Sequence, residues 1–245
     1  MEKNKYLVLI PCLEAAQTVT KVMLELAKLD VQFDVVVIDN GSKDGTLNVV
    51  RDAIKKYNLK GYYLIRNIRN LGYGASQKIA LFFGIYNGYE KLIIIHADNQ
   101  YPVNLMPELI RSNLETKAAM TIGTRLGHKD VKKVMPLWRY YGNYILSAVN
   151  RWAYDLHLDE FNSEFRIYDL KFMHEKVNID RCGNIENYTL DSLLEIRAAK
   201  GEINQFVIPC SYPSDAHHPV FFDLLVYGVY NFYKAFKFRL LRRRF

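Results

Sequence analysis

IIIHADNQYP, residues 93–102, is the stretch that decides the fold of this chain. Three β-branched apolar residues in a row are typical of a buried strand, and the polar cluster after them marks where the strand leaves the core. Pro102 has no backbone N–H to donate and ends the sheet pairing there. In an open parallel sheet, ligands bind in the crevice beyond the carboxyl ends of the strands. Asp98 is therefore a candidate ligand-binding residue.

Asp98 and Gln100 offer hard oxygen ligands on one side of this turn. Such ligands suit Mg²⁺ or Mn²⁺ holding a diphosphate group. A second interpretation is that Asp98 only caps the helix that follows. The stretch by itself leaves both interpretations open.

Strand-like apolar runs alternate with helical patterns through the first half of the chain. Expected strands lie at 6–11, 32–39, 61–66, 91–96 and 118–123. Between them, apolar residues recur at a spacing of three or four, which indicates helices. This alternation predicts right-handed crossovers and a mainly parallel sheet covered by helices on both faces. The fold class is therefore α/β, of a Rossmann-like kind.

The pattern changes after Thr124. The second half is expected to contain an aromatic-rich helix at 135–156, an edge strand at 161–170, a helix at 188–200 and a last strand at 203–209. Because no linker composition interrupts the chain, we expect one domain over 1–218, followed by a tail at 219–245.

Charge is unevenly distributed over the 245 residues, whose formal net charge is +7. The tail at 219–245 carries six Lys or Arg against one Asp, a surplus of five, which leaves +2 for residues 1–218. A nearly neutral body argues against a nucleic-acid partner. The three cysteines lack metal-ligand spacing, and we expect reduced thiols. The charged N-terminus leads straight into a strand, so we expect no signal peptide.

The tail is both apolar and basic. Its longest stretch without charge, 224–233, is half the length that a bilayer span requires. An amphipathic helix of this composition is expected to lie at a membrane surface, with Arg242–Arg244 near anionic lipid. The alternative is a terminal helix packed on the domain or in a homodimer interface. The sequence also allows a separate membrane partner.

A second polar cluster, DNGSKDGT at 39–46, follows the strand expected at 32–39. Asp39 stands at the carboxyl end of that strand, and the glycines permit a tight turn into a helix. A carboxylate there can accept hydrogen bonds from a ribose or a base. The alternative is an ordinary turn in which Asp44 or Thr46 caps the helix.

Four ordered motifs together resemble the family 2 glycosyltransferases. They are IPCL at 10–13, VIDNGSKDGT at 37–46, RNLGYGA at 69–75 and HADNQYP at 96–102. Within the family, the chain is most similar to the dolichol-phosphate or polyprenyl-phosphate sugar transferase branch. The resemblance covers about residues 5–215 and implies a GT-A fold, a nucleotide-sugar donor and Mg²⁺ or Mn²⁺.

The resemblance also implies roles for individual residues. The donor would contact Pro11, Leu13, Glu14, Asp39, Asn40, Ser42, Asn70, Ala97 and Asp98, and the metal would contact Asp98 and Gln100. An acceptor or its phosphate would contact Arg125, Arg139, Ser163, Arg166 and His217. Asp98, Arg125, Arg139 and Asp191 would be the catalytic residues. For each Arg the alternative is a surface ion pair, and for Asp191 it is a solvent-facing position on a helix.

The sequence departs from the family pattern in three places. The usual Asn-Glu after the first strand is replaced by Glu14-Ala15, so that only Glu14 could substitute. The first Asp of the Asp-x-Asp element is His96, and the Gly of a Ser-Gly pair is Glu164. The Gln-x-x-Arg-Trp element of processive synthases is absent from the sequence, which argues against a polymerase.

These observations predict an inverting, metal-dependent glycosyltransferase at the cytoplasmic face of a membrane, in the synthesis of a cell-envelope glycan. The expected acceptor is a polyprenyl phosphate, which is already an anion and needs no general base. An alternative acceptor is a sugar hydroxyl of a lipid-linked or surface glycan, with Asp191 as base ahead of Glu160. A third hypothesis is a GT-A module that has lost its chemistry.

Overall fold

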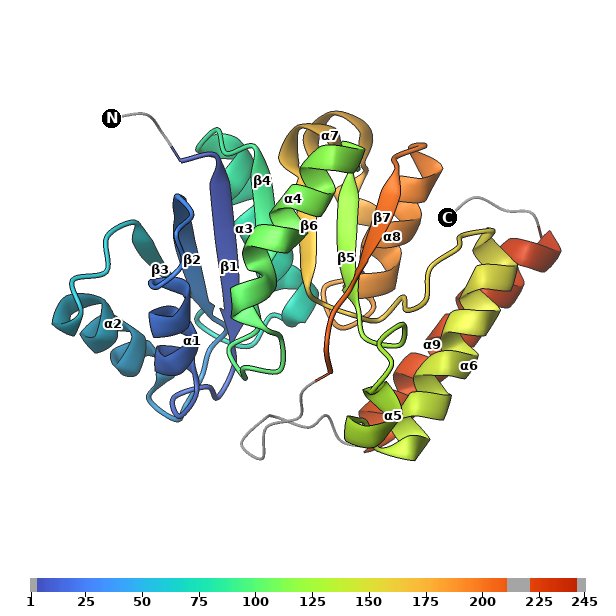
Figure 1. Cartoon of the computed structure of the whole chain (residues 1–245), viewed down its shortest axis with the longest axis horizontal. Coiled ribbons are helices and arrows are strands. Elements are labelled where there is room, and N and C mark those ends of the chain that lie inside the picture. Colours follow the sequence, from blue (N-terminus) through green and yellow to red (C-terminus); the bar gives the residue numbers. More distant parts are fainter. Residues whose placement is uncertain (1–3, 211–220, 242–245) are drawn as a thin grey trace.

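The structure is a computed structural model that describes residues 4–210 and 221–241. Its described strands form one sheet of seven, in the order β3-β2-β1-β4-β6-β5-β7 (Figure 1). The strands are β1 Tyr6–Cys12, β2 Phe33–Asp39, β3 Tyr62–Arg66, β4 Lys91–Ile94, β5 Met120–Thr124, β6 Arg166–Asp169 and β7 Ile203–Val207. The first five follow the sequence expectation closely. The sheet confirms the mixed α/β class.

Helices cover both faces of the sheet. They are α1 Val19–Leu26, α2 Thr46–Lys56, α3 Tyr73–Tyr86, α4 Met106–Thr116, α5 Val131–Val134, α6 Leu137–Tyr154, α7 Leu170–Lys176, α8 Tyr188–Ala198 and α9 Phe221–Leu241, with short 3₁₀ turns η1 Val103–Leu105 and η2 Ile179–Arg181. Buried residues of α1, α2 and α4 pack on one face, and those of α3, α7 and α8 on the other.

The central strands are apolar throughout because both of their faces are buried. Leu7 and Leu9 of β1 belong to one core cluster, whereas Val8 and Ile10 belong to the cluster on the opposite face. All four side chains have no exposed surface. Successive residues of a strand point to opposite faces, so a parallel strand between two helical layers has no polar side.

The strand β6 corrects one expectation. Residues 161–170 were predicted to contain an edge strand, but β6 lies inside the sheet and pairs antiparallel with both β4 and β5. Sequence pattern identifies a strand but not its neighbours, which depend on contacts distant in the chain. Because β6 runs opposite to β4, its first residues meet the carboxyl end of β4. The segment before Arg166 therefore reaches the candidate ligand crevice.

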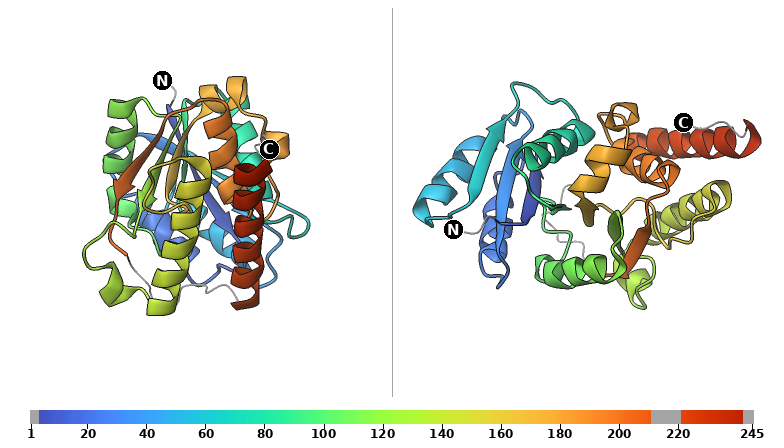
Figure 2. Two further views of the ribbon diagram at one scale, coloured as in Figure 1. Left: turned by 90° about the vertical axis from the view of Figure 1, so that its right-hand side faces the viewer. Right: turned by 90° about the horizontal axis from the view of Figure 1, so that it is seen from above.

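The C-terminal helix α9 packs beside α6 at one end of the molecule (Figure 2). The amides of Asn150 and Asn231 meet between the two helices at 3.3 Å. Within residues 4–210 and 221–241, we find no helix with the length and apolar character needed to span a bilayer. Of the predicted tail, residues 219–220 and 242–245 lie outside the described residues.

Candidate active site

Five segments converge at the carboxyl edge of the parallel strands. They are the loops after β1, β2, β4 and β5, and the residues that precede β6. Parallel pairing aligns the strand ends: Cys12 pairs with Asp39, and Asp39 pairs with Arg66. The topology thus gathers most of the predicted site residues at one edge.

Asp39 is a buried carboxylate at the end of β2, with no exposed surface. Its Oδ1 accepts a hydrogen bond from the backbone N–H of Ser42 at 3.0 Å. Its Oδ2 lies 4.0 Å from Nε of Arg66 and has no hydrogen-bond partner among the described residues. Buried polar atoms are nearly always hydrogen-bonded, so this oxygen is suited to a donor group on a ligand. The sequence expectation that Asp39 contacts a nucleotide fits this geometry.

Asn40 holds neighbouring loops together. Its amide nitrogen donates to Oδ1 of Asn70 at 2.8 Å and to the carbonyl of Gly72 at 3.2 Å. Its oxygen accepts from Nδ2 of Asn67 at 2.9 Å and from the backbone N–H of Leu71 at 3.0 Å. With both amide atoms bound to protein, Asn40 ties the end of β2 to the β3–α3 loop.

The loop after β1 is tied to the loop after β2. The backbone N–H of Glu14 donates to Oγ of Ser42 at 3.0 Å, and Oε1 of Glu14 accepts from the backbone N–H of Lys43 at 2.9 Å. Glu14, which replaces the family's Asn, therefore braces the turn after Asp39. Pro11 is half-buried, and Leu13, two residues on, is 44% exposed.

Asp98 lies in the loop after β4 and is half-buried. Its Oδ1 accepts from the backbone N–H of Gln100 at 3.1 Å, across Asn99, whose φ of 58° is left-handed. Ala97 is buried beneath the loop. The described part of the chain holds no group of three His, Cys, Asp or Glu side chains placed to bind a metal. One carboxylate completed by ligand oxygens and water is nevertheless a usual Mg²⁺ arrangement, so this donor set fits such an ion.

Arg125 follows β5 and is buried against Glu160. Its backbone N–H donates to Glu160 Oε2 at 2.8 Å, and its guanidinium forms an ion pair with the same carboxylate. The guanidinium carbon also lies 5.7 Å from the centre of the Tyr101 ring. Glu160 thus fixes the direction of Arg125 beside the loop that carries Asp98.

Two predicted acceptor residues are fully buried and hydrogen-bonded to backbone carbonyls. Arg166 is fully buried, and its guanidinium donates to the carbonyls of Ser163, Phe161 and Thr189 at 2.7, 2.8 and 2.7 Å. Ser163 is also fully buried, and its hydroxyl donates to the carbonyl of Gly123. Both side chains are fully buried and donate to backbone carbonyls, so they hold the segment before β6 in place.

Two further predicted residues, Arg139 and Asp191, lie on helices. Arg139, on α6, is half-buried, with its guanidinium carbon 5.2 Å from the centre of the Trp138 ring. Asp191, on α8, is buried rather than solvent-facing: its carboxylate accepts from Tyr230 OH at 2.9 Å and from the N–H of Gly183 at 3.0 Å, and pairs with Lys234 Nζ at 3.1 Å. His217 lies outside the described residues.

Tyr73, which the sequence interpretation did not single out, joins His96 to Glu164. Its hydroxyl lies 2.8 Å from Nε2 of His96 and 2.9 Å from Oε2 of Glu164. The only sequence signal was its place in the RNLGYGA motif at the start of a helix. The contact itself depends on the antiparallel placement of β6.

Solved structures share this fold. Glucosyl-3-phosphoglycerate synthase from Mycobacterium tuberculosis, crystallised with Mn²⁺, UDP and glucosyl-3-phosphoglycerate, superposes with a TM-score of 0.67 at 15% identity, over 96% of this chain and 80% of that one. TarS from S. aureus (residues 1–349) gives 0.56 at 16% identity, over 93% of this chain and 65% of that one. The fold is of the GT-A type that glycosyltransferases use.

Sequence comparison gives the family. The model described as glycosyl transferase family 2 matches residues 7–180, and the chain belongs to this family. A Methanocaldococcus jannaschii protein, MJ0544, whose function is uncharacterized, is 31% identical over 199 residues, 78% of this chain and 81% of the relative. A second protein of that organism, MJ1222, is 24% identical over 61% of this chain and 58% of its own length. The protein is thus a family 2 glycosyltransferase.

Proposed function

We propose that this protein transfers a sugar from a nucleotide-diphosphate donor to a polyprenyl phosphate, with inversion of configuration. The observation that carries the donor half is the buried Oδ2 of Asp39, which has no hydrogen-bond partner among the described residues, at the same sheet edge as Asp98. A ligand hydroxyl or N–H at Asp39 and a diphosphate near Asp98 would satisfy both groups. UDP in the glucosyl-3-phosphoglycerate synthase structure supports this placement by analogy of fold.

Asp98, with Gln100 beside it, would hold a divalent cation. Mg²⁺ or Mn²⁺ bound there would stabilise the negative charge of the departing diphosphate without a proton transfer. Structural neighbours that bind Mn²⁺ or Mg²⁺ together with UDP support this proposal. The protein's own part is to fix the direction of the Asp98 carboxylate through the hydrogen bond from Gln100 N–H.

A lipid phosphate as acceptor is supported by the surroundings of Asp191. Its carboxylate forms an ion pair with Lys234 and accepts hydrogen bonds from Tyr230 and from the N–H of Gly183. Both of its oxygens are therefore engaged by the protein, which counts against the hydroxyl acceptor that requires Asp191 as base. An anionic phosphate needs no base, and the buried Arg125 guanidinium, which Glu160 holds beside the loop that carries Asp98, could orient it.

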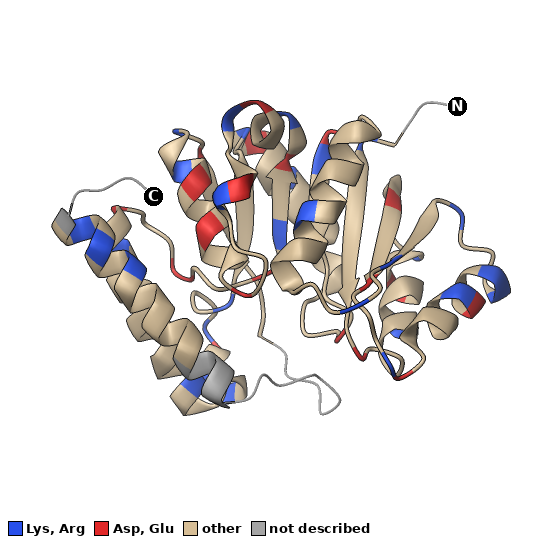
Figure 3. Ribbon diagram, turned by 180° about the vertical axis from the view of Figure 1, so that it is seen from behind, with Lys and Arg blue, Asp and Glu red and all other residues tan. Residues whose placement is uncertain are grey.

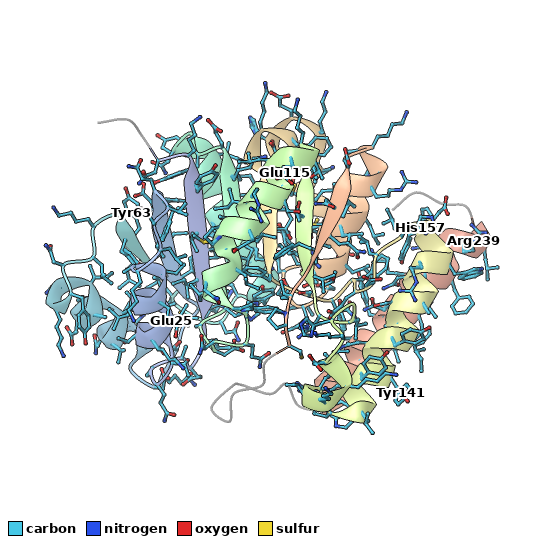
Figure 4. All side chains as sticks on the ribbon, viewed as in Figure 1. Glu25, Tyr63, Glu115, Tyr141, His157 and Arg239 are labelled. Carbon is cyan, nitrogen blue, oxygen red and sulfur yellow. The ribbon has the colours of Figure 1, made fainter. Side chains whose placement is uncertain are left out.

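A membrane location at the cytoplasmic face is part of this proposal, and the α6–α9 pair supports it. Both helices expose one apolar stripe at helical spacing: Trp138, Tyr141, Ile145 and Trp152 on α6, and Val226, Val229, Tyr233, Phe236 and Leu240 on α9. The rings of Trp152 and Phe236, 5.7 Å apart, join the two stripes. Figure 4 places Tyr141 and Arg239 at opposite ends of this pair.

Cations lie among these aromatic side chains. Lys237 Nζ is 5.5 Å from the Tyr233 ring centre, and the Arg239 guanidinium is 5.6 Å from that of Trp152. Figure 3 shows Lys and Arg gathered toward the C-terminal end of α9. Aromatic rings and long basic side chains together suit the headgroup region of an anionic bilayer. The membrane-facing surface we propose is thus built from α6 as well as from the tail.

Turnover by the purified full-length chain tests the function. A panel of UDP- and GDP-sugars is supplied with Mn²⁺ and undecaprenyl phosphate in vesicles, and nucleotide release and lipid-linked product are measured by mass spectrometry. We expect product with one donor, loss of product with EDTA, and at least a hundredfold slower turnover in Asp98→Asn, on the order of the loss of one electrostatic stabiliser. Product on a sugar hydroxyl and none on the lipid phosphate would contradict the proposal.

Vesicle flotation tests the membrane surface. The protein is expected to float with vesicles that contain phosphatidylglycerol and not with phosphatidylcholine alone. Tyr141→Glu and Tyr233→Glu should each reduce flotation, because these side chains are 54% and 59% exposed on the two stripes. Tyr86→Glu is the matched control, since Tyr86 is 91% exposed on α3, away from the pair. Equal flotation of all three variants would contradict a role for this surface.

A further inference from the structure

Two of the departures from the family pattern, His96 and Glu164, are neighbours across the sheet. Ile94 of β4 pairs with Arg166 of β6 in the antiparallel register, and Ile93 pairs with Ile167. In this register each step forward along β4 matches one step backward along the other segment. Two steps beyond the last pair bring His96 and Glu164 to the same level, where their side chains can interact.

Tyr73, at the start of α3, connects them. Its hydroxyl donates to Oε2 of Glu164 at 2.9 Å and lies 2.8 Å from Nε2 of His96. A phenol has a single proton. While that proton is donated to the carboxylate, the Tyr73 oxygen must accept from His96, so the contact selects the form of His96 that carries a proton on Nε2.

Glu164 is itself firmly held. Its side chain is 9% exposed, and its carboxylate also accepts hydrogen bonds from the Thr189 hydroxyl on α8 and from Nε2 of Gln77, the latter at 3.4 Å. Burial raises the pKa of this carboxyl, while nearby Arg166 and His96 act in the opposite direction. Through its hydrogen bonds with Tyr73, Gln77 and Thr189, the side chain links α3, α8 and the segment before β6.

The same residue also supports the other end of the Asp98 loop. The backbone N–H of Glu164 donates to the hydroxyl of Tyr101 at 3.0 Å. The Tyr101 ring stacks on Phe165, with centres 5.9 Å apart, and meets the His96 ring edge-on at 5.3 Å. Residues 96 and 101 are thus both tied to position 164, and Asp98 lies between them.

We propose that Glu164 is a positioning residue that, through Tyr73 and His96 on one side and Tyr101 on the other, fixes the loop carrying Asp98 for the diphosphate of the donor. This inference rests on the proposed function in that the ligand is a nucleoside diphosphate. A glycine at position 164 could not accept from Tyr73, so the Glu and the His act as a pair. Where the family has Asp and Gly, this chain has His96 and Glu164 joined through the Tyr73 hydroxyl, a contact called the brace below.

The first test needs no ligand. Nitrogen-15 NMR of the histidine rings in the free protein is expected to show His96, assigned by its loss in His96→Gln, with its proton on Nε2. In Tyr73→Phe, which removes only the hydroxyl, this preference should be lost. An unchanged His96 signal in Tyr73→Phe would overturn the brace, whatever the protein binds.

The second test is binding, measured by calorimetry with Mn²⁺ and either UDP or GDP. Tyr73→Phe is expected to weaken the affinity for whichever nucleotide the wild type binds by about tenfold, the scale of a lost hydrogen bond to a charged group. Glu164→Gln in the Tyr73→Phe background should weaken it little further, because the two act through one contact.

The matched control is Tyr89→Phe. Tyr89 is also buried and donates to a carboxylate, Oδ2 of Asp34 at 2.6 Å, at the opposite edge of the sheet. We expect it to lower the melting temperature and to leave nucleotide affinity unchanged. If Tyr73→Phe likewise lowers the melting temperature and leaves nucleotide affinity unchanged, the positioning role is wrong. If the wild type binds neither nucleotide, the proposed donor class fails, while the NMR result still decides the brace.

Discussion

The candidate site contains single carboxylates whose surroundings differ. Asp39 is buried with one oxygen lacking a hydrogen bond from the described residues, whereas both oxygens of Asp191 are engaged. Because a buried acceptor without a partner costs stability, the first arrangement is suited to a ligand and the second to holding the fold. The residue type alone does not distinguish them.

Replacing Asp39 by Asn is expected to separate binding from stability. The amide can keep the hydrogen bond from Ser42 N–H, but it presents a donor where the ligand is expected to donate. Nucleotide affinity, measured by calorimetry, should fall at least tenfold. The free energy of unfolding in urea should stay the same or rise, because a buried charge has been removed. A less stable variant with unchanged affinity would contradict the assignment.

Glu164 is expected to make the free energy of unfolding fall with rising pH. Burial raises its pKa above the ordinary value of 4.5, with Arg166 and His96 opposing the shift. In the unfolded chain the carboxyl has its ordinary pKa, and in the folded chain its pKa is higher. At a pH between the two pKa values, the folded chain keeps a proton that the unfolded chain has released. The free energy of unfolding should therefore fall as the pH rises through this window.

The Glu164→Gln variant has no titrating carboxyl at this position and therefore serves as the reference. We expect the difference in unfolding free energy between wild type and variant, from urea titrations at a series of pH values, to be constant below pH 4.5 and to shift against the wild type as the pH rises. Parallel curves for the two proteins would contradict the raised pKa.

The loops before helices determine how closely the elements around the candidate site can pack. Gly72 precedes α3 with φ 93° and ψ 158°, a conformation that is essentially restricted to glycine. A Cβ at this position would lie 2.2 Å from the carbonyl oxygen of Asn184, in the loop before α8. The β3–α3 loop can thus pack against the α8 side of the molecule only if residue 72 has no side chain.

Gly72→Ala should therefore destabilise the protein by about 2–4 kcal/mol, from backbone strain together with the clash. Gly45, before α2, has the same φ of 93° with no atom within 4 Å of a Cβ. Gly45→Ala is then expected to cost only about 1 kcal/mol, the strain alone. Urea unfolding measures both; equal losses would show that the contact with Asn184 is unimportant.

At the scale of the molecule, α9 is joined to the sheet domain through α6 and α8. The contacts with α8 converge on Asp191, which accepts from Tyr230 and pairs with Lys234, both on α9. The helix predicted as a tail thus shares buried polar contacts with the domain. These contacts hold the apolar stripe of α9 beside that of α6.

Asp191→Asn and Lys234→Gln break this ion pair from opposite sides. Each is expected to lower the free energy of unfolding by about 3 kcal/mol, because one partner of a mostly buried pair is left behind. If Asp191 serves to dock α9, the two variants should change kcat for lipid phosphate by similar factors. A loss of turnover confined to Asp191→Asn would instead support a role as base and the hydroxyl acceptor.

The sequence by itself determined the α/β class, the family and most of the loops that carry the candidate site. Periodicity reports which faces of a segment are buried, and residues that follow a parallel strand lie at its carboxyl end whatever the order of strands. For this reason Asp39 and Asp98 could be assigned to one edge before any contact was known.

Only the tertiary structure decided which side chains meet there. It placed β6 inside the sheet and buried Arg166 and Ser163 among backbone carbonyls. It also paired Asp191 with Lys234 and joined Glu164 to His96 through the Tyr73 hydroxyl. Each of these contacts joins segments far apart in the chain. A local pattern carries no information about such partners, because they depend on the order and direction in which the strands pair.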